Sequence, residues 1–184
     1  MATEILRQPI YDTQSISAGA VAVGTQYNLF SVPVGSSSKT LLDTNMTVAG
    51  QLPYSEASIH GIRIHVYTRG SAGIGVNNYN QILNNCTMSF KKEDRTILEV
   101  PLYMIPSGYG LTGGVITTES TTTIEAVSNG VPSKSQFFDL LVPEKFKSRD
   151  RLQVNVDVKA AFTTETVTTY LVVVLEAQIT KEYY

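Results

Sequence analysis

Few residues in this chain have the types and spacing that chemistry requires. The two histidines, His60 and His65, lie five positions apart in one alternating stretch. Because successive side chains of a strand point to opposite faces, an odd separation places the two imidazoles on opposite sides of a sheet. One strand therefore does not offer both to the same metal ion, and the chain has no HExxH or CxxC motif. We expect both histidines to be structural.

Nucleophilic and phosphate-binding motifs are equally sparse. No GxSxG elbow is present to activate a serine, and the glycine-rich stretch GSAGIG at 70–75 is not followed by Lys-Ser or Lys-Thr. The single cysteine, Cys86, alternates with Met88 and Phe90, which predicts a buried structural thiol. Acidic residues are dispersed, so a glycosidase-like carboxylate pair stays open only as a three-dimensional arrangement. The sequence predicts no cofactor, no metal and no enzymatic activity.

The composition favours a protein whose surface is largely covered by partners. A chain of 184 residues is long enough for one substantial core and short for two. Charged residues make up only 16%, against roughly 25% in typical soluble domains. The net charge is −2 and the Lys and Arg residues are scattered, which argues against a nucleic-acid footprint. Partner proteins or copies of the same chain would provide this cover.

The N-terminal sequence MATEILRQPIYDTQ lacks the basic and apolar regions of a secretory signal. The longest apolar run, Leu171 to Leu175, is far shorter than a transmembrane helix. We therefore expect synthesis in a cytoplasm and no transmembrane segment.

Period-two alternation recurs along the chain, whereas helical periodicity is scarce. In RLQVNVDVK the apolar residues Leu152, Val154, Val156 and Val158 alternate with polar ones, and Ile62, Ile64 and Val66 alternate with Arg63, His65 and Tyr67. Other predicted strands cover 25–32, 39–46, 84–92, 95–102, 115–127, 135–142 and 166–180. The stretch PEKFKSRD at 143–150 is the one plausible short helix. Since several connections are longer than hairpin turns, an all-β single jelly-roll or Greek-key sandwich or barrel is predicted.

The first 24 residues differ from the rest. Ile5, Leu6, Ile10 and Tyr11 follow no clear period, and a run of small residues comes after them. We interpret 1–24 as an extended N-terminal arm and 25–184 as a single domain. An ordinary edge strand followed by a hairpin is the alternative.

Two stretches carry a resemblance to a known family. LLDTNMTVAGQLPYSEASIHGIRIHVY at 41–67, followed by PEKFKSRDRLQVNVDV at 143–158, resembles the coat proteins of icosahedral bacteriophages, particularly the small single-barrel capsid proteins of tailless phages. The similarity extends over most of 39–180 and leaves the arm unmatched. It implies a capsid subunit in a virion, with its own copies and other virion proteins as partners. Because the functional surfaces of such proteins are assembly interfaces, it brings no catalytic residue.

Candidate interface residues follow from this resemblance and from the terminal strand. In LVVVL, Leu171, Val173 and Leu175 would fill the interior, and Val172 and Val174 would face a neighbouring element or subunit. The full set of candidates is Ile5, Leu6, Ile10, Tyr11, Tyr109, Leu111, Val172, Val174, Tyr183 and Tyr184. The alternative for Val172 and Val174 is a strand covered on both faces within its own domain. The alternative function is a phage decoration, fibre or adhesin-type module that binds a glycan or a protein.

Overall fold

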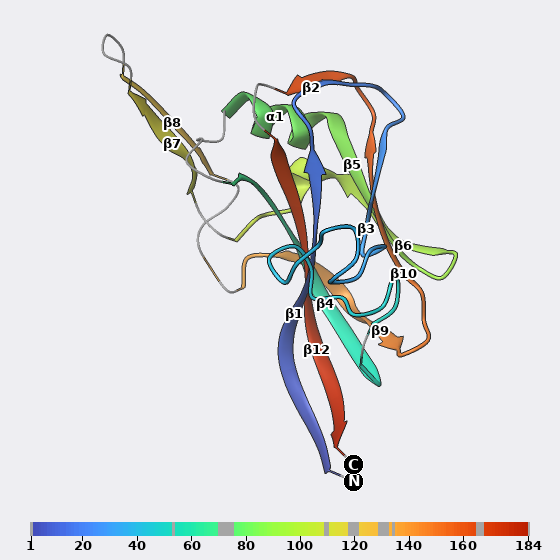
Figure 1. The fold of residues 1–184 in the computed structure, drawn as a ribbon. Coiled ribbons are helices and arrows are strands. Elements are labelled where there is room, and N and C mark those ends of the chain that lie inside the picture. Colours follow the sequence, from blue (N-terminus) through green and yellow to red (C-terminus); the bar gives the residue numbers. More distant parts are fainter. Residues whose placement is uncertain are drawn as a thin grey trace.

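The structure, a computed structural model, describes residues 2–52, 54–69, 76–108, 111–117, 122–128, 133, 135–164 and 168–183. Two four-stranded antiparallel sheets form a sandwich (Figure 1). The first sheet contains, in spatial order, β1 (Ala2–Ile16), β12 (Thr169–Tyr183), β4 (Glu56–Thr68) and β9 (Phe138–Lys147). The second contains β3 (Gln26–Leu29), β10 (Leu152–Val158), β5 (Cys86–Lys92) and β6 (Arg95–Pro101).

The connectivity of these eight strands is that of a jelly roll. If only these eight strands are counted from 1 to 8 along the chain, the first sheet has the order 1-8-3-6 and the second has the order 2-7-4-5. The chain changes sheet at each connection except the β5–β6 hairpin, so almost every neighbour in a sheet is distant in sequence. The predicted all-β sandwich with jelly-roll topology is confirmed.

Smaller elements decorate this sandwich. Strands β2 (Gly19–Val21) and β11 (Phe162–Thr164) pair with each other, and β7 (Leu111–Thr117) pairs with β8 (Thr122–Ser128) in a ribbon that projects from the body (Figure 1). The helix α1 (Val76–Asn85) lies near β11, and a single 3-10 turn, η1 (Leu102–Met104), follows β6.

The core follows the alternation of the sequence. Leu152, Val154, Val156 and Val158 of β10 are all buried, and so are the apolar residues of β4 and β5 that share their side of the sandwich. Phe90 of the second sheet stacks on Phe146 of the first with ring centroids 5.9 Å apart. Cys86 is buried as expected, and burial raises the pKa of its thiol to about 12, helped by the charge of Asp157.

The N-terminal segment is part of the domain. Residues 2–16 form the edge strand β1, which is paired with β12 from Ala2 opposite Tyr183 to Ile16 opposite Thr169. The two termini therefore lie side by side (Figure 1). The prediction of an extended arm over 1–24 is therefore wrong for residues 2–16. Ile10 and Ile16 point into the core, as the apolar residues of a half-buried strand do.

The helix predicted over 143–150 is also wrong. Residues 143–147 continue β9, since Phe146 is fully buried opposite Ala57 of β4. Proline lacks a backbone donor, which an edge strand such as β9 tolerates, so Pro143 does not interrupt it.

Two further segments differ from the predicted pattern. Residues 76–80, which lie outside every predicted strand and outside the one predicted helix, begin helix α1, which buries Tyr79, Ile82 and Leu83 at helical spacing. Residues 39–46, expected to be a strand, form turns with one isolated bridge at Thr44. The turn forms because the Asp43 carboxylate accepts hydrogen bonds from the backbone N–H (2.8 Å) and the hydroxyl (3.0 Å) of Thr40.

The outer face of β4 is more buried than the alternation of apolar and polar residues in its sequence predicts. Arg63, expected on a wet face, is buried and pairs with Glu176 of β12 at 2.8 Å. Its guanidinium also donates to the Ser133 carbonyl at 3.0 Å and lies 5.8 Å from the Phe137 ring centroid. Arg63 thereby fastens the segment before β9 onto the first sheet.

Gly61 allows this close approach. A Cβ at Gly61 would lie 2.0 Å from the Phe137 ring and 2.8 Å from the Phe138 carbonyl oxygen. We expect Gly61→Ala to destabilise the fold by about 1–3 kcal/mol through overpacking, measured by urea or thermal unfolding. Adding Phe137→Leu should recover part of the loss, and a stability equal to wild type for Gly61→Ala alone would contradict the packing.

Candidate assembly surfaces

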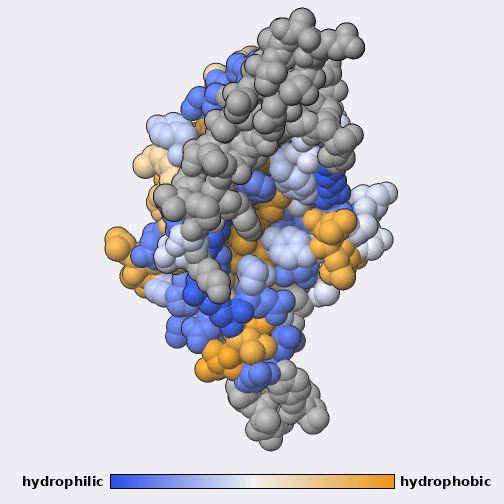
Figure 2. Space-filling model, turned by 90° about the vertical axis from the view of Figure 1, so that its left-hand side faces the viewer, coloured by the Kyte–Doolittle hydropathy of each residue, from blue (hydrophilic) through white to orange (hydrophobic). Residues whose placement is uncertain are grey.

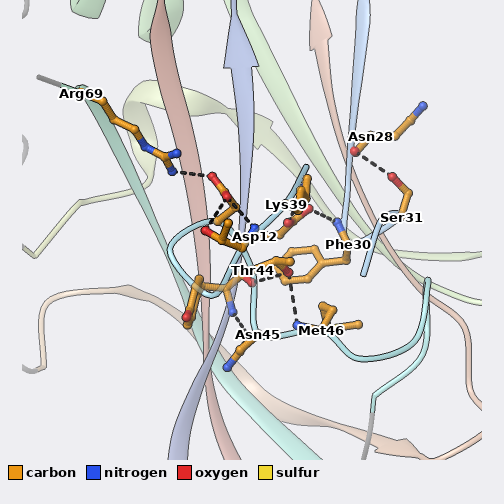
Figure 3. Close-up of polar contacts among 12 residues, drawn as sticks. Asp12, Asn28, Phe30, Ser31, Lys39, Thr44, Asn45, Met46 and Arg69 are labelled. Atoms are coloured by element: carbon orange, nitrogen blue, oxygen red, sulfur yellow. Dashed lines mark hydrogen bonds and ion pairs between the residues drawn. The ribbon is translucent and has the colours of Figure 1, made fainter. Parts of the chain in front are cut away.

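The segment 40–46 covers part of the free edge of β1. Asn45 accepts a hydrogen bond from the Tyr11 backbone N–H at 3.0 Å and donates to the Pro9 carbonyl at 2.9 Å (Figure 3). The Thr44 hydroxyl donates to the Tyr11 carbonyl at 3.1 Å, and the Tyr11 hydroxyl donates to the Leu41 carbonyl. These contacts satisfy edge groups that would otherwise offer a template for another strand. They also fix the adjacent Leu41 and Leu42 at the surface.

A buried ion pair anchors the chain just before this segment. The Asp12 carboxylate of β1 is fully buried and accepts from the Lys39 ammonium and from the Phe30 backbone N–H, each at 2.6 Å (Figure 3). Phe30 is itself buried with a φ of 60°, a conformation that bulky residues rarely adopt. Since the charge of Asp12 is buried, removing Lys39 would leave it unpaired. The ion pair therefore ties the loop before 40–46 to β1.

A second ion pair connects the same segment to the outer face of the first sheet. Arg69 donates to the Asp43 carboxylate (Figure 3). Its guanidinium also lies 4.4 Å from the Tyr170 ring centroid. Burial of the Asp43 carboxyl favours its neutral form, but donation from Thr40 and Arg69 outweighs burial, so the pKa of Asp43 is lower than its ordinary value. The Tyr170 ring in turn stacks on Tyr67 of β4 at 5.5 Å.

His65 continues this aromatic row, with its ring 5.7 Å from that of Tyr67. Burial lowers the pKa of His65 below its ordinary value. The unfolded chain therefore binds a proton at this residue more readily than the folded protein, and the folded state loses stability as the pH falls below about 6.5. We expect His65→Gln to gain stability relative to wild type between about pH 7 and pH 5, as followed by thermal unfolding. His60→Gln on the same strand is the control, and a constant difference across this range would contradict the expectation.

Large apolar side chains are exposed at several separate places. Leu141 and Val142 are 98% and 78% exposed on β9, and Leu41 and Leu42 are exposed beside β1. Figure 2 shows such apolar patches separated by hydrophilic surface on one side of the molecule. The remaining exposed large apolar residues among those described are Ile5, Val23, Val48, Tyr103 and Met104.

A bulge produces the exposure on β9. Asp139 pairs with Gly61 and Glu144 pairs with Ile59, so the four residues 140–143 lie opposite His60 alone. Leu140 turns into the core, whereas the extra length pushes Leu141 and Val142 out of the sheet. Neither residue is among the predicted interface residues, although three consecutive apolar side chains on one strand do not all fit on one face.

The predicted interface residues lie in different environments in the structure. Ile5 is exposed, Val172 is partly buried, and Tyr11 packs against the 40–46 segment. Ile10 is in the core and Val174 is only 4% exposed, so neither side chain is free to meet a neighbour; Leu6 is partly buried against the core. For Leu111 and Tyr183 the structure describes the backbone alone, within β7 and β12. Tyr109 and Tyr184 lie outside the described residues.

Within the described ranges, no group of three or more His, Cys, Asp or Glu side chains is arranged to hold a metal ion. No described helix is long and apolar enough to cross a membrane. No protein-family model matches this chain, and no curated protein matches it.

Proposed function

We propose that this protein is a self-assembling structural subunit of a virus-like shell. The observation that carries the proposal is the position of its two most exposed apolar pairs. Leu41–Leu42 lies beside β1 and Leu141–Val142 lies on β9, and these are the two opposite edges of the same four-stranded sheet. A subunit with adhesive patches on opposite edges can contact one neighbour on each side.

Contacts between different patches propagate from subunit to subunit. A head-to-tail contact of this kind closes into a ring or extends into a filament, and a shell joins such rings through further contacts, whereas a single self-complementary patch stops at a dimer. The low charged fraction of 16% also suits a surface that neighbours cover. The jelly roll is compatible with this role and with others, because capsid proteins, lectins and cupins share it.

The test is light scattering coupled to size exclusion on the full chain over a range of concentrations, with negative-stain microscopy of each peak. We expect rings, filaments or larger closed particles that grow with concentration. A monodisperse monomer at all concentrations would contradict the proposal.

A further inference from the structure

A polar hollow of about 550 Å³ lies beside the C-terminal end of β1, and it plays no part in the proposed assembly. Its wall includes the last residues of β1, the segment before 40–46, and the start of β12. Hydroxyl groups dominate the lining, and the exposed residues that carry them are Ser15, Ser17, Ser37, Ser38 and Thr168. Each hydroxyl can both donate and accept a hydrogen bond.

The charged groups in the wall are paired. Lys39 binds Asp12 at 2.6 Å and Arg69 binds Asp43, so each cation is matched by a carboxylate (Figure 3). An anionic ligand such as a phosphate would find no positive charge without a carboxylate partner here, and it would also lie near the Asp43 carboxylate that lines the hollow. The pairing therefore favours a neutral ligand rich in hydroxyl groups.

The hollow also has apolar walls and a fixed shape. Val32 and Tyr170 contribute apolar atoms to the lining, with the Arg69 guanidinium 4.4 Å from the Tyr170 ring centroid. The volume lies within the range of roughly 300–1,000 Å³ usual for small-molecule sites. Ser37 and Ser38 have φ angles of 48° and 63°, two consecutive non-glycine residues in the left-handed region. Such strain gathers at ligand-binding loops, where the surrounding structure enforces it. Here the Gly35 N–H donates to the Lys39 carbonyl at 2.8 Å and closes the turn.

We propose that this hollow binds a neutral saccharide. The serine and threonine hydroxyls would exchange hydrogen bonds with the sugar hydroxyls, while the apolar walls would meet its C–H faces. This binding goes beyond the assembly function and does not depend on it.

Saturation-transfer NMR on the full chain tests the proposal, with glucose, galactose, mannose and N-acetylglucosamine as separate millimolar probes. We expect saturation transfer to at least one of them, without competition from inorganic phosphate. Ser15→Val removes one hydroxyl at a strand position that suits a β-branched residue, and it should raise the Kd about 3- to 10-fold.

Ser58→Val is the matched control, because Ser58 lies on β4 of the same sheet outside the hollow. It should leave the Kd unchanged. The proposal would be overturned if none of the four sugars received saturation, if phosphate displaced the bound sugar, or if Ser15→Val bound it as tightly as wild type.

Discussion

Val174→Asp is expected to leave little folded protein. The Val174 side chain is 4% exposed on β12, between Tyr11 of β1 and Arg63 of β4. Arg63 is already bound to Glu176 at 2.8 Å and to the Ser133 carbonyl at 3.0 Å, so it offers little to a new carboxylate. A buried charge without a committed partner costs several kcal/mol, out of a total stability of about 5–15 kcal/mol.

Val172→Asp is the matched control, since Val172 lies two residues away on the same face of β12 and is partly buried. It should fold, with a loss of about 1 kcal/mol. Soluble yield, circular dichroism and thermal unfolding distinguish the two variants. If Val174→Asp folded as well as Val172→Asp, the burial of Val174 within its own chain would be contradicted.

Alternation predicted the strands that bury one face each. The β10 residues Leu152 to Val158 and the β5 residues from Cys86 to Phe90 lie as their period-two pattern indicates, because that pattern depends only on which face meets the core. The same reasoning failed on the outer face of the first sheet. Arg63 looks like a solvent-facing residue, and its burial depends on Glu176 and Ser133, which are distant in sequence.

Local signals predict the wrong element where tertiary contacts outweigh them. Residues 143–150 carry Pro and basic residues at helix-like positions, yet Phe146 gains more by packing on Phe90 across the sandwich. The strand expected at 39–46 gives way to a turn held by Asp43 and Thr40. Asp12 is not among the predicted site residues. A carboxylate on the apolar face defined by Ile10 and Ile16 is nevertheless a sign of a buried polar contact.

Leu141→Asp should abolish assembly and leave the fold intact, because this side chain is 98% exposed and contributes little to the core of its own chain. Its effect on stability should be within about 0.5 kcal/mol, as for other surface substitutions. Ser148→Asp adds the same charge in the exposed turn after β9 and should assemble like wild type. Light scattering and microscopy read out assembly, and thermal unfolding reads out the fold.

A mixing experiment tests whether the two edges meet each other. Leu42→Asp keeps the Leu141–Val142 patch intact, and Leu141→Asp keeps the Leu41–Leu42 patch intact. If the contact is head to tail, neither variant should assemble alone, but an equal mixture should form heterodimers that stop growing, because each pair then has one working contact and no free one. Dimers of Leu42→Asp alone would mean that the β9 patch binds its own kind. The shell would then be built from two-fold contacts, and the proposed head-to-tail arrangement would be wrong.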